Sequence, residues 1–309
     1  MPAPFISICI PAYNREDYLR NLLDSIAMQS FKDFEVIVSD DSSNDSVEKV
    51  VKDYQNLFTI HYFHNAPAAG TPQNWNLAIE KAHGTWIKLM HDDDSFSRRD
   101  SLQHFVNAIN NNPDSEFIFS GYYNVSNKSS QPQAFPSQFV YQTMLKNPAV
   151  LLAGNIIGPP SVVIHKKNTG VEYNRNLQWL VDIDFYIHNL KNAKVFFIKD
   201  RLVNIGINPQ QVTNQSLGVP EIEIPEFFMV YEQLSSRQKK SILVYDAAWR
   251  LIRNLNITSV NQIRIAGWEG DIPSEIIKMI NFQKPFGKKL LRFGPASKAL
   301  MSISFITNR

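Results

Sequence analysis

Apolar runs alternate with helix-like segments along the first part of the chain. FISICIPAYN is an apolar, β-prone run that stops at Pro11. Similar strand-like runs lie at 34–45, 59–65, 85–94 and 115–126, and helix-like segments lie between them at 15–30, 46–58, 71–84 and 97–113. One of the helix-like segments is TPQNWNLAIEKAHG, and Gly84 is predicted to end this helix. This βαβ rhythm predicts a parallel, doubly wound sheet over the first ~125 residues.

The pattern loosens after about residue 128. Residues 127–138 are polar and turn-rich, which predicts an exposed excursion. A helix, a Gly-Pro-Pro turn and a strand are expected within 144–167, and a turn leading into an amphipathic helix within 176–194. Residues 195–208 supply one or two strands, and from about 220 the chain is largely helical.

Composition narrows the possible classes. The chain has 309 residues, of which 44% are hydrophobic, and its formal net charge is +2. Such a balance gives no overall field for binding nucleic acid. The single cysteine, Cys9, rules out an intrachain disulfide. The N-terminus lacks the features of a signal peptide, and no run approaches the ~18 apolar residues that span a bilayer, so a cytoplasmic protein is expected.

Polar residues follow three of the predicted strands where each strand ends. They are Pro11 to Asn14, Asp40 to Ser43, and Asp92 to Asp94. Ligands of open parallel sheets bind beyond the carboxyl ends of the strands, so these loops are expected to meet at one edge. Three consecutive aspartates are compatible with a solvated loop, in which water screens them. They are also compatible with a divalent cation, because Mg²⁺ and Mn²⁺ prefer carboxylate oxygens.

Three segments together resemble the family 2 glycosyltransferases of the GT-A fold. They are SICIPAYNREDYLRNLLDSIAMQSFKDFEVIVSDDSSND, NLAIEKAHGTWIKLMHDDDSF and NLQWLVDIDFYIHNL, and the likeness covers roughly residues 4 to 205. The resemblance implies a Rossmann-like, doubly wound and mostly parallel sheet with a helical C-terminal extension. It also implies inverting transfer of a sugar from a nucleotide diphosphate sugar, with UDP or dTDP favoured, to an acceptor hydroxyl in the synthesis of surface polysaccharide or lipid-linked glycans.

The same resemblance suggests how the chain is divided. A GT-A catalytic domain is expected over 1–215, with a nucleotide-sugar-binding half at 1–125 and an acceptor half at 126–215. A mainly helical region with a basic tail follows at 216–309.

The Asp-x-Asp motif of this family corresponds to His91-Asp92-Asp93, which Asp94 follows. The resemblance implies that Asp93 binds Mn²⁺ or Mg²⁺ with Asp94 as a second ligand, and that Asp92 lies on the ribose or diphosphate side. His91 stands where the family has an acidic residue. It is expected to be a hydrogen-bonding neighbour, with the role of ligand as the alternative. A motif shifted by one residue, Asp92-Asp93-Asp94, is a second alternative.

The family's nucleotide-binding positions fall on residues Pro11, Tyr13, Asn14, Asp41 and Asn76. Tyr13 is expected to stack on the base, although a tyrosine packed beside a strand end is the alternative. Asp41 would accept a hydrogen bond from the base N–H, while Asp40 and Ser42 shape the turn. Asn76 lies on the helix that lines the donor pocket, and Trp75 stands where many relatives have an arginine.

The catalytic base of the family is the aspartate of a Glu-Asp pair, and here the pair is Val181-Asp182. The resemblance therefore assigns the base to Asp182, although an aspartate at a helix start can also be a simple N-cap. Asp184 is expected to be structural. Without the glutamate, a catalytically inactive nucleotide-sugar-binding module stays an alternative. A nucleotidyltransferase is a weaker one, because IPAYNREDYL has no glycine for a phosphate loop.

The tail, residues 281–309, contains six Lys or Arg and no Asp or Glu. Apolar residues are interleaved with these charges, which predicts either peripheral contact with an anionic membrane, at its inner face, or packing against the rest of the protein. The expected partners are a nucleotide diphosphate sugar and a glycan or lipid-linked glycan acceptor. No nucleic acid is expected, and the oligomeric state is open.

Overall fold

The computed structural model describes residues 3–126, 129–167, 170–208 and 216–308. Its contacts divide the chain into two compact units. The first, called here the sheet unit, consists of Met1–Tyr141, Ile156–Asn176 and Asp184–Pro209. The second, the helical unit, consists of Gln142–Asn155, Leu177–Ile183 and Gln210–Arg309. The expected domain boundary after residue 215 falls at the edge of the undescribed segment 209–215, and it stays a prediction.

A nine-stranded sheet forms the centre of the sheet unit. Its strands are β1 (Ile6–Ala12), β2 (Phe34–Asp40), β3 (Ile60–His64), β4 (Trp86–Leu89), β5 (Ser95–Phe96), β6 (Phe117–Ser126), β7 (Ser129–Pro132), β8 (Val163–Lys166) and β9 (Val195–Gly206). Along the sheet the order is β3-β2-β1-β4-β8-β6-β9-β5, and β7 pairs with β6. This mixed but mostly co-directional sheet confirms the predicted α/β class.

The strand directions follow the βαβ prediction with one insertion. β3, β2, β1 and β4 are parallel neighbours, and β6 is parallel to β9. Between the two groups lies β8, which is antiparallel to both β4 and β6. Because two reversals restore the direction, β6 still runs the same way as β4. The sequence could not indicate this insertion, because β8 comes from a segment far along the chain.

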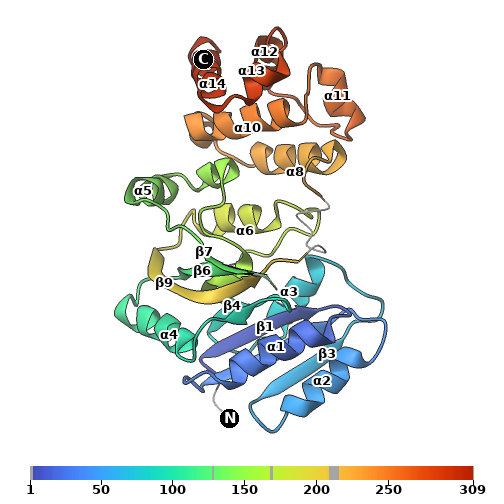
Figure 1. The fold of residues 1–309 in the computed structure, drawn as a ribbon, viewed down its shortest axis with the longest axis vertical. Coiled ribbons are helices and arrows are strands. Elements are labelled where there is room, and N and C mark those ends of the chain that lie inside the picture. The colour runs from blue at the N-terminus through green and yellow to red at the C-terminus, as the bar shows by residue number, and fades with distance from the viewer. Residues whose placement is uncertain (1–2, 127–128, 168–169, 209–215, 309) are drawn as a thin grey trace. The chain divides into compact units, whose positions relative to one another are not determined.

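Helices cover the sheet and bury its apolar runs. Those of this part of the chain are α1 (Glu16–Ala27), α2 (Ser46–Tyr54), α3 (Gln73–Glu80), α4 (Ser101–Asn111) and α5 (Gln138–Lys146), and α6 (Val181–Asn189) precedes β9. Figure 1 shows α1 and α2 in front of β1 and β3. In α1 the buried stripe includes Leu19, Leu22, Leu23 and Ile26, whereas Tyr18 is 38% exposed at its rim. All seven residues of β1 and all seven of β2 are buried, as expected for strands covered on both faces.

Two sequence expectations are wrong in detail. The helix within 71–84 ends at Glu80, so Gly84 does not close it. Gly84 instead lies against β1, where an added Cβ would be 2.7 Å from the backbone nitrogen of Ser7. Within the excursion expected over 127–138, most of the described residues are exposed, but Ser129–Pro132 form β7.

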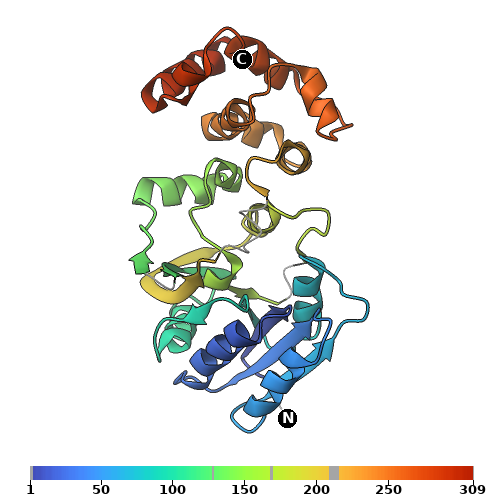
Figure 2. The same ribbon diagram turned by 45° about the vertical axis from the view of Figure 1, so that its right-hand side comes forward.

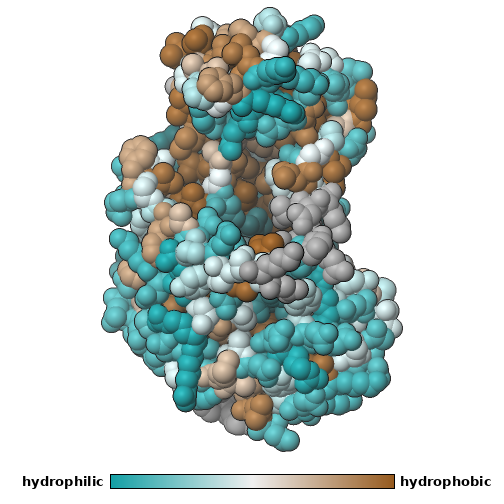
Figure 3. Space-filling model, in the orientation of Figure 1, coloured by the Kyte–Doolittle hydropathy of each residue, from teal (hydrophilic) through white to brown (hydrophobic). Residues whose placement is uncertain are grey.

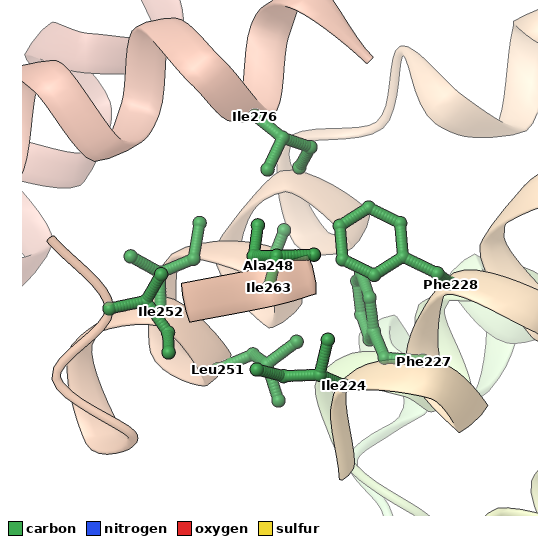
Figure 4. A pocket seen from close by; sticks show the side chains of 9 residues that line it. Ile224, Phe227, Phe228, Ala248, Leu251, Ile252, Ile263 and Ile276 are labelled. Atoms are coloured by element: carbon green, nitrogen blue, oxygen red, sulfur yellow. The ribbon is translucent and has the colours of Figure 1, made fainter. Parts of the chain in front are cut away.

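The helical unit has an apolar core of its own. Its elements are the 3₁₀ segment Pro148–Ala153, α8 (Pro220–Glu232), α9 (Ser236–Lys239), α10 (Ile242–Asn254), α11 (Val260–Ile265), α12 (Ser274–Gln283), α13 (Lys288–Arg292) and α14 (Gly294–Thr307). A second 3₁₀ turn, Pro160–Val162, belongs to the sheet unit. Figure 4 shows apolar side chains of α8, α10, α11 and α12 pointing toward one another, among them Ile224, Phe228 and Ile276. The pocket that they line is entirely apolar, which indicates a packed core and not a binding site for a polar ligand.

The basic tail is part of this unit. Tyr245 Oη of α10 lies 2.7 Å from Ser304 Oγ of α14, and Trp249 Nε1 donates to Ser297 Oγ at 3.0 Å. In Figure 2, α14 is the long red helix that carries these serines. Its packing supports the alternative in which the tail packs against the rest of the protein. Within the described residues, none of the helices has the length and apolar character that crossing a membrane requires.

Candidate active site

The segment His91–Asp94 turns sharply where β4 ends. Met90 N still bonds to Cys9 O of β1 at 2.9 Å, and Asp94 N then closes a turn onto His91 O at 3.1 Å. The solvated-loop interpretation of the three aspartates is wrong, because Asp92 is only 7% exposed and Asp94 only 4%. Buried carboxylates need partners, since removing a charge from water is costly unless it is paired.

The partners come from two distant parts of the sheet unit, the loop after β1 and the end of β9. Arg15 Nη1 lies 3.5 Å from Asp92 Oδ1 and 3.6 Å from Asp93 Oδ2. Asn208 Nδ2 donates to Asp93 Oδ2 at 2.6 Å, and Gly206 N donates to Asp94 Oδ1 at 2.9 Å. Sequence reasoning assigned none of these three residues, because nothing in their local pattern signals the contact.

Gly206 allows β9 to approach the acidic segment closely. A Cβ at this position would lie 2.2 Å from the backbone oxygen of Asp93. Only glycine therefore fits between the end of β9 and the turn, and this close contact brings the Gly206 N–H within reach of Asp94.

The acidic cluster carries more negative charge than its partners compensate. Burial, together with the charge of Asp93, raises the pKa of Asp92 to about 7, although Arg15 acts in the opposite direction. The same two causes raise the pKa of Asp94 well above its ordinary value. A bound cation would favour the ionised form of these carboxylates, because an opposite charge nearby lowers a carboxyl pKa.

His91 lies with two of these carboxylates in a set that fits a metal ion. One ligand atom each of His91, Asp93 and Asp94 can be chosen such that all three lie within 4.8 Å of one another. His91 Nδ1 lies 3.9 Å from Asp94 Oδ2, and His91 Nε2 is buried with no hydrogen-bond partner among the described residues. Burial also lowers the pKa of His91, which favours the neutral imidazole that a metal requires. This arrangement fits His91 as a third ligand better than as the hydrogen-bonding neighbour expected from the sequence.

A buried lysine supports the same turn. Lys88 of β4 is fully buried and donates through Nζ to the backbone oxygen of Ser161, and Ser161 Oγ accepts from His91 N at 2.9 Å. The Lys88 Nζ also lies 5.1 Å from the ring centroid of Phe105. Burial lowers the pKa of Lys88 to about 7, and Asp94 acts against this shift. The only sequence signal was a lysine inside an otherwise apolar strand, and it was missed.

Hydrogen bonds join the loops after β1 and β2, and β1 is the neighbour of β4. Asn14, with a φ of 50°, donates from its backbone N to Ser42 Oγ at 2.8 Å and accepts from Ser43 N at 3.3 Å. Pro11 pairs with Ser39 of β2. On the other side of β1, pairing with β4 ends at Cys9, so β4 does not need the N–H that proline lacks. Tyr13 is 57% exposed, which leaves its ring accessible to a ligand.

Asp41 already holds its own loop. Its carboxylate accepts hydrogen bonds from Asn65 Nδ2 at 2.8 Å, Ala69 N at 3.0 Å and Gly70 N at 2.8 Å. A carboxylate has about four acceptor positions, so one remains for a ligand. Asp40 accepts from Ser42 N at 2.8 Å and from Tyr62 Oη at 2.7 Å, which shapes the turn as the sequence suggested.

The amide of Asn76 is used within the chain. Its Nδ2 donates to Tyr173 O at 2.8 Å and its Oδ1 accepts from Tyr173 N at 3.0 Å. Its neighbour Trp75 contacts the rings of both Tyr173 and His91, at centroid distances of 5.1 Å and 4.7 Å. These contacts make Asn76 and Trp75 a support for the His91 side of the cluster. A direct contact of Asn76 with a donor stays a prediction.

Asp182 is a half-buried carboxylate in the first turn of α6. Its Oδ2 accepts from Asn155 Nδ2 at 2.7 Å and its Oδ1 from Ile183 N at 2.8 Å. Burial raises the pKa of Asp182 to about 6, and these donors only partly offset the effect. A carboxylate with such a pKa is ionised at neutral pH and still basic enough to take a proton. Asp184, two residues further, lies 3.4 Å from His188 Nδ1.

Glu226 of α8, which sequence reasoning missed, holds the chain just before Asp182. Its two carboxylate oxygens accept from the backbone nitrogens of Gln178, Trp179 and Leu180, at 2.7, 2.9 and 2.8 Å. Gln178 and Trp179 lie before α6, and Leu180 directly precedes its first residue, so Glu226 orders the chain that leads into the helix. The cap alternative for Asp182 stays open, because Asp182 Oδ1 itself accepts from Ile183 N in the first turn.

Comparison with known proteins identifies the family. The model of glycosyl transferase family 2 matches residues 7–159, a range that includes the loops after β1 and β2 and the whole acidic cluster. The chain belongs to glycosyl transferase family 2. A glycosyltransferase of Rickettsia typhi is 26% identical to it over 224 residues, which are 70% of this chain and 68% of that protein.

Further similarities extend this family assignment. The GalNAc(5)-diNAcBac-PP-undecaprenol beta-1,3-glucosyltransferase of Campylobacter jejuni is 38% identical over 93 residues, or 29% of this chain and 30% of that enzyme. Among solved structures, S. aureus TarS 1–349 in complex with UDP-GlcNAc matches with a TM-score of 0.69 at 18% identity, covering 98% of this chain and 90% of that one. At that identity the match establishes the fold, and it confirms the GT-A architecture expected for this family 2 glycosyltransferase.

Proposed function

We propose that this family 2 glycosyltransferase is an inverting, cation-dependent enzyme. It moves a sugar from a nucleotide diphosphate sugar, with UDP or dTDP favoured, to a hydroxyl of a glycan or lipid-linked glycan acceptor. The observation that carries the proposal is the ligand set of His91, Asp93 and Asp94 at the end of β4. Relatives support the substrate class, since TarS was solved with UDP-GlcNAc and the Campylobacter jejuni relative is named for an undecaprenol-linked acceptor.

The sheet unit supplies the donor site in this proposal. His91, Asp93 and Asp94 hold a divalent cation, and the mixture of imidazole and carboxylate ligands favours Mn²⁺ over Mg²⁺. The cation, when bound, offsets the negative charge that develops on the leaving diphosphate. Arg15 faces Asp92 and Asp93, so its guanidinium is close enough to the leaving diphosphate to bind one of its oxygens.

The base and ribose of the donor are bound by the loops after β1 and β2. The exposed ring of Tyr13 stacks on the base, and the remaining acceptor position of Asp41 takes the imide N–H of uracil or thymine. Pro11 and Asn14 shape this loop, and Asp92 lies on the ribose side. Asn76 lines the pocket through the Trp75 and Tyr173 contacts.

Asp182 is the general base. It accepts the proton of the acceptor hydroxyl while that oxygen attacks the anomeric carbon and the bond to the diphosphate breaks. Asn155 Nδ2 and Ile183 N hold the carboxylate in one orientation. The preceding family glutamate is replaced by Val181, and the carboxylate of Glu226 supports this segment through its backbone instead.

The acceptor brings the enzyme to a membrane, so we place it at the inner face of the cytoplasmic membrane as a peripheral protein. Although α14 packs against α10, the tail still presents a surface for this contact, because Leu290 and Phe293 are 44% and 60% exposed beside Lys288 and Lys289. Figure 3 shows apolar and polar surface side by side on the C-terminal helices at the top of the view. Such a surface suits an anionic interface.

A donor screen tests the proposed function. The purified chain is incubated with UDP-, dTDP- and GDP-sugars, with Mn²⁺, Mg²⁺ or EDTA, and release of the nucleoside diphosphate is measured. We expect release from a UDP- or dTDP-sugar that requires the cation. Metal-dependent binding without any release would favour the inactive binding module, and equal release in EDTA would contradict the assigned cation.

A further inference from the structure

A second charged site lies in the helical unit. The end of α10, the loop that follows it, the end of α12 and α13 surround a pocket that encloses about 370 Å³, part of it open to solvent. Its lining includes four cationic side chains, Arg253, Lys284, Lys288 and Arg292. The neutral part of the lining combines apolar with amide and hydroxyl groups, and no aspartate or glutamate takes part.

The positive charge of this basic pocket is not neutralised by the chain. Among the described residues, no carboxylate lies within ion-pair distance of Lys284, Lys288 or Arg292. The buried carboxylate of Asp246, on the same helix as Arg253, is already paired with Arg250 at 3.2 Å and Lys298 at 2.7 Å. Like charges gathered around one concavity repel each other, and an anion that binds there removes the repulsion.

Arg253 is held in place before any ligand arrives. Its Nη1 donates to Ser297 Oγ at 3.0 Å and its Nε to Asn254 Oδ1 at 3.0 Å. Partial burial lowers the pKa of Arg253, the charges of Arg250 and Arg292 add to the effect, and Asp246 acts in the opposite direction. A fixed guanidinium loses less conformational freedom on binding an oxyanion than a free one does. The three other cations are exposed and can close around the ligand.

We propose that the basic pocket binds a phosphate group through Arg253, Lys284, Lys288 and Arg292. The phosphate belongs either to a soluble phosphate ester or to a phospholipid headgroup. Guanidinium and ammonium groups together provide the charged hydrogen bonds that a phosphate accepts, and Phe286 and Leu291 of the lining suit an apolar continuation of the ligand. This site does not depend on the proposed transfer reaction.

A pair of double variants tests the pocket. Lys284→Gln/Arg292→Gln removes two exposed cations of the lining, and Arg237→Gln/Lys278→Gln removes two exposed cations of the same unit that do not line it. Both variants lose the same charge, and their melting temperatures should match that of the wild type. Binding of glycerol 3-phosphate is measured by calorimetry in EDTA, which prevents cation-dependent binding at the acidic cluster.

We expect the pocket variant to bind at least about tenfold more weakly than the wild type, because two of the four charged donors to the phosphate are lost. The control variant should stay within about twofold. Equal losses of affinity in the two variants would show that general surface charge causes the binding, and would contradict the proposed phosphate site.

Vesicles distinguish the two sources of phosphate. Sedimentation with phosphatidylglycerol vesicles at ~0.15 M salt, with phosphatidylcholine vesicles as reference, is compared for the three proteins. Selective loss of pelleting in the pocket variant, with competition by glycerol 3-phosphate, identifies a lipid headgroup. Binding of glycerol 3-phosphate without vesicle binding identifies a soluble ester. If the wild type binds neither probe, the proposal is wrong.

Discussion

The sheet unit and the helical unit hold their charged clusters in opposite ways. Asp92 and Asp94 of the acidic cluster are almost fully buried, and each contacts a partner from elsewhere in the chain. In the basic pocket Lys284, Lys288 and Arg292 are exposed and have no carboxylate partner among the described residues. Burial makes an electrostatic contact strong and insensitive to salt, whereas exposure makes it weak and screened.

The difference indicates two kinds of site. A largely enclosed, preorganised set of groups suits a small cation in one geometry, which the proposed stabilisation of a leaving group requires. An exposed set of flexible lysines tolerates different ligands that share one charged group. The same contrast predicts that substitutions in the two clusters will differ in size and in salt dependence.

Asp182 offers the sharpest test of this comparison, because it is a half-buried carboxylate that lies in the helical unit. Asp182→Asn should lower turnover by about 10²–10⁴ through loss of the general base, with donor binding retained. Turnover and donor affinity are measured together, and Asp271→Asn, an exposed change in the same unit, is the control. Near-normal turnover would remove Asp182 from catalysis.

The pH dependence of the same group has a defined sign. Burial raises the folded-state pKa of Asp182 to about 6, above that of an unfolded aspartate. The folded protein therefore holds this proton more tightly, and its stability decreases as the pH rises from about 4 to about 6. Wild-type turnover should increase through pH 6 as the base ionises, and this rise should be absent in Asp182→Asn. At pH 8 the variant should melt no lower than the wild type, whereas loss of a cap would lower its melting temperature.

Removal of a ligand tests the buried half of the comparison. Asp93→Asn should lower turnover by about 10²–10³, because the cation contributes several kcal/mol to the transition state. Titration with Mn²⁺ in the presence of UDP should show weaker metal-dependent binding. Asp114→Asn, an exposed change in the sheet unit, should behave as the wild type, and unchanged metal dependence in Asp93→Asn would show that the ion binds elsewhere.

Glu226 tests whether a carboxylate that touches only backbone can affect catalysis. Glu226→Gln keeps the size of the side chain but removes the charge from its three N–H contacts, which should cost about 1–2 kcal/mol of stability. As a positioning residue for Asp182 it should also lower turnover by about tenfold or less, with donor KM unchanged. Glu221→Gln, on the exposed side of α8, is the control. A stability loss with normal turnover and an unchanged pH profile would restrict Glu226 to a structural role.

Changing the salt concentration should have the smallest effect on ligand binding, and it compares the buried and exposed clusters directly. Raising ionic strength from ~0.1 M to ~1 M shortens the Debye length from about 10 Å to about 3 Å. Phosphate binding at the exposed basic pocket should weaken several-fold, while cation binding at the acidic cluster should change by less than about twofold. Calorimetric titrations at the two ionic strengths measure both, and an equal response would contradict the contrast between buried and exposed clusters.

Local pattern predicted much of the sheet unit. The apolar runs before Pro11, Asp40 and Asp92 became β1, β2 and β4, and their parallel pairing follows from the alternation with helices. Where parallel strands end at one edge, the residues that follow them lie at that edge. The candidate loops were therefore readable from spacing, and the resemblance of three segments to a known family assigned their roles.

Contacts between distant segments were decided only by the tertiary structure. Arg15, Gly206 and Asn208 contact the aspartates across long separations in sequence, and Glu226 contacts backbone groups 46 to 48 residues away. β8 lies between β4 and β6 for the same reason. The burial of Asp92 and Asp94 also depends on these contacts. Periodicity and composition report which local structure a residue prefers. The pairing of buried charges depends instead on which distant groups the folded chain brings within a few ångströms. Because an unpaired buried charge is costly, the fold must place a partner beside each one.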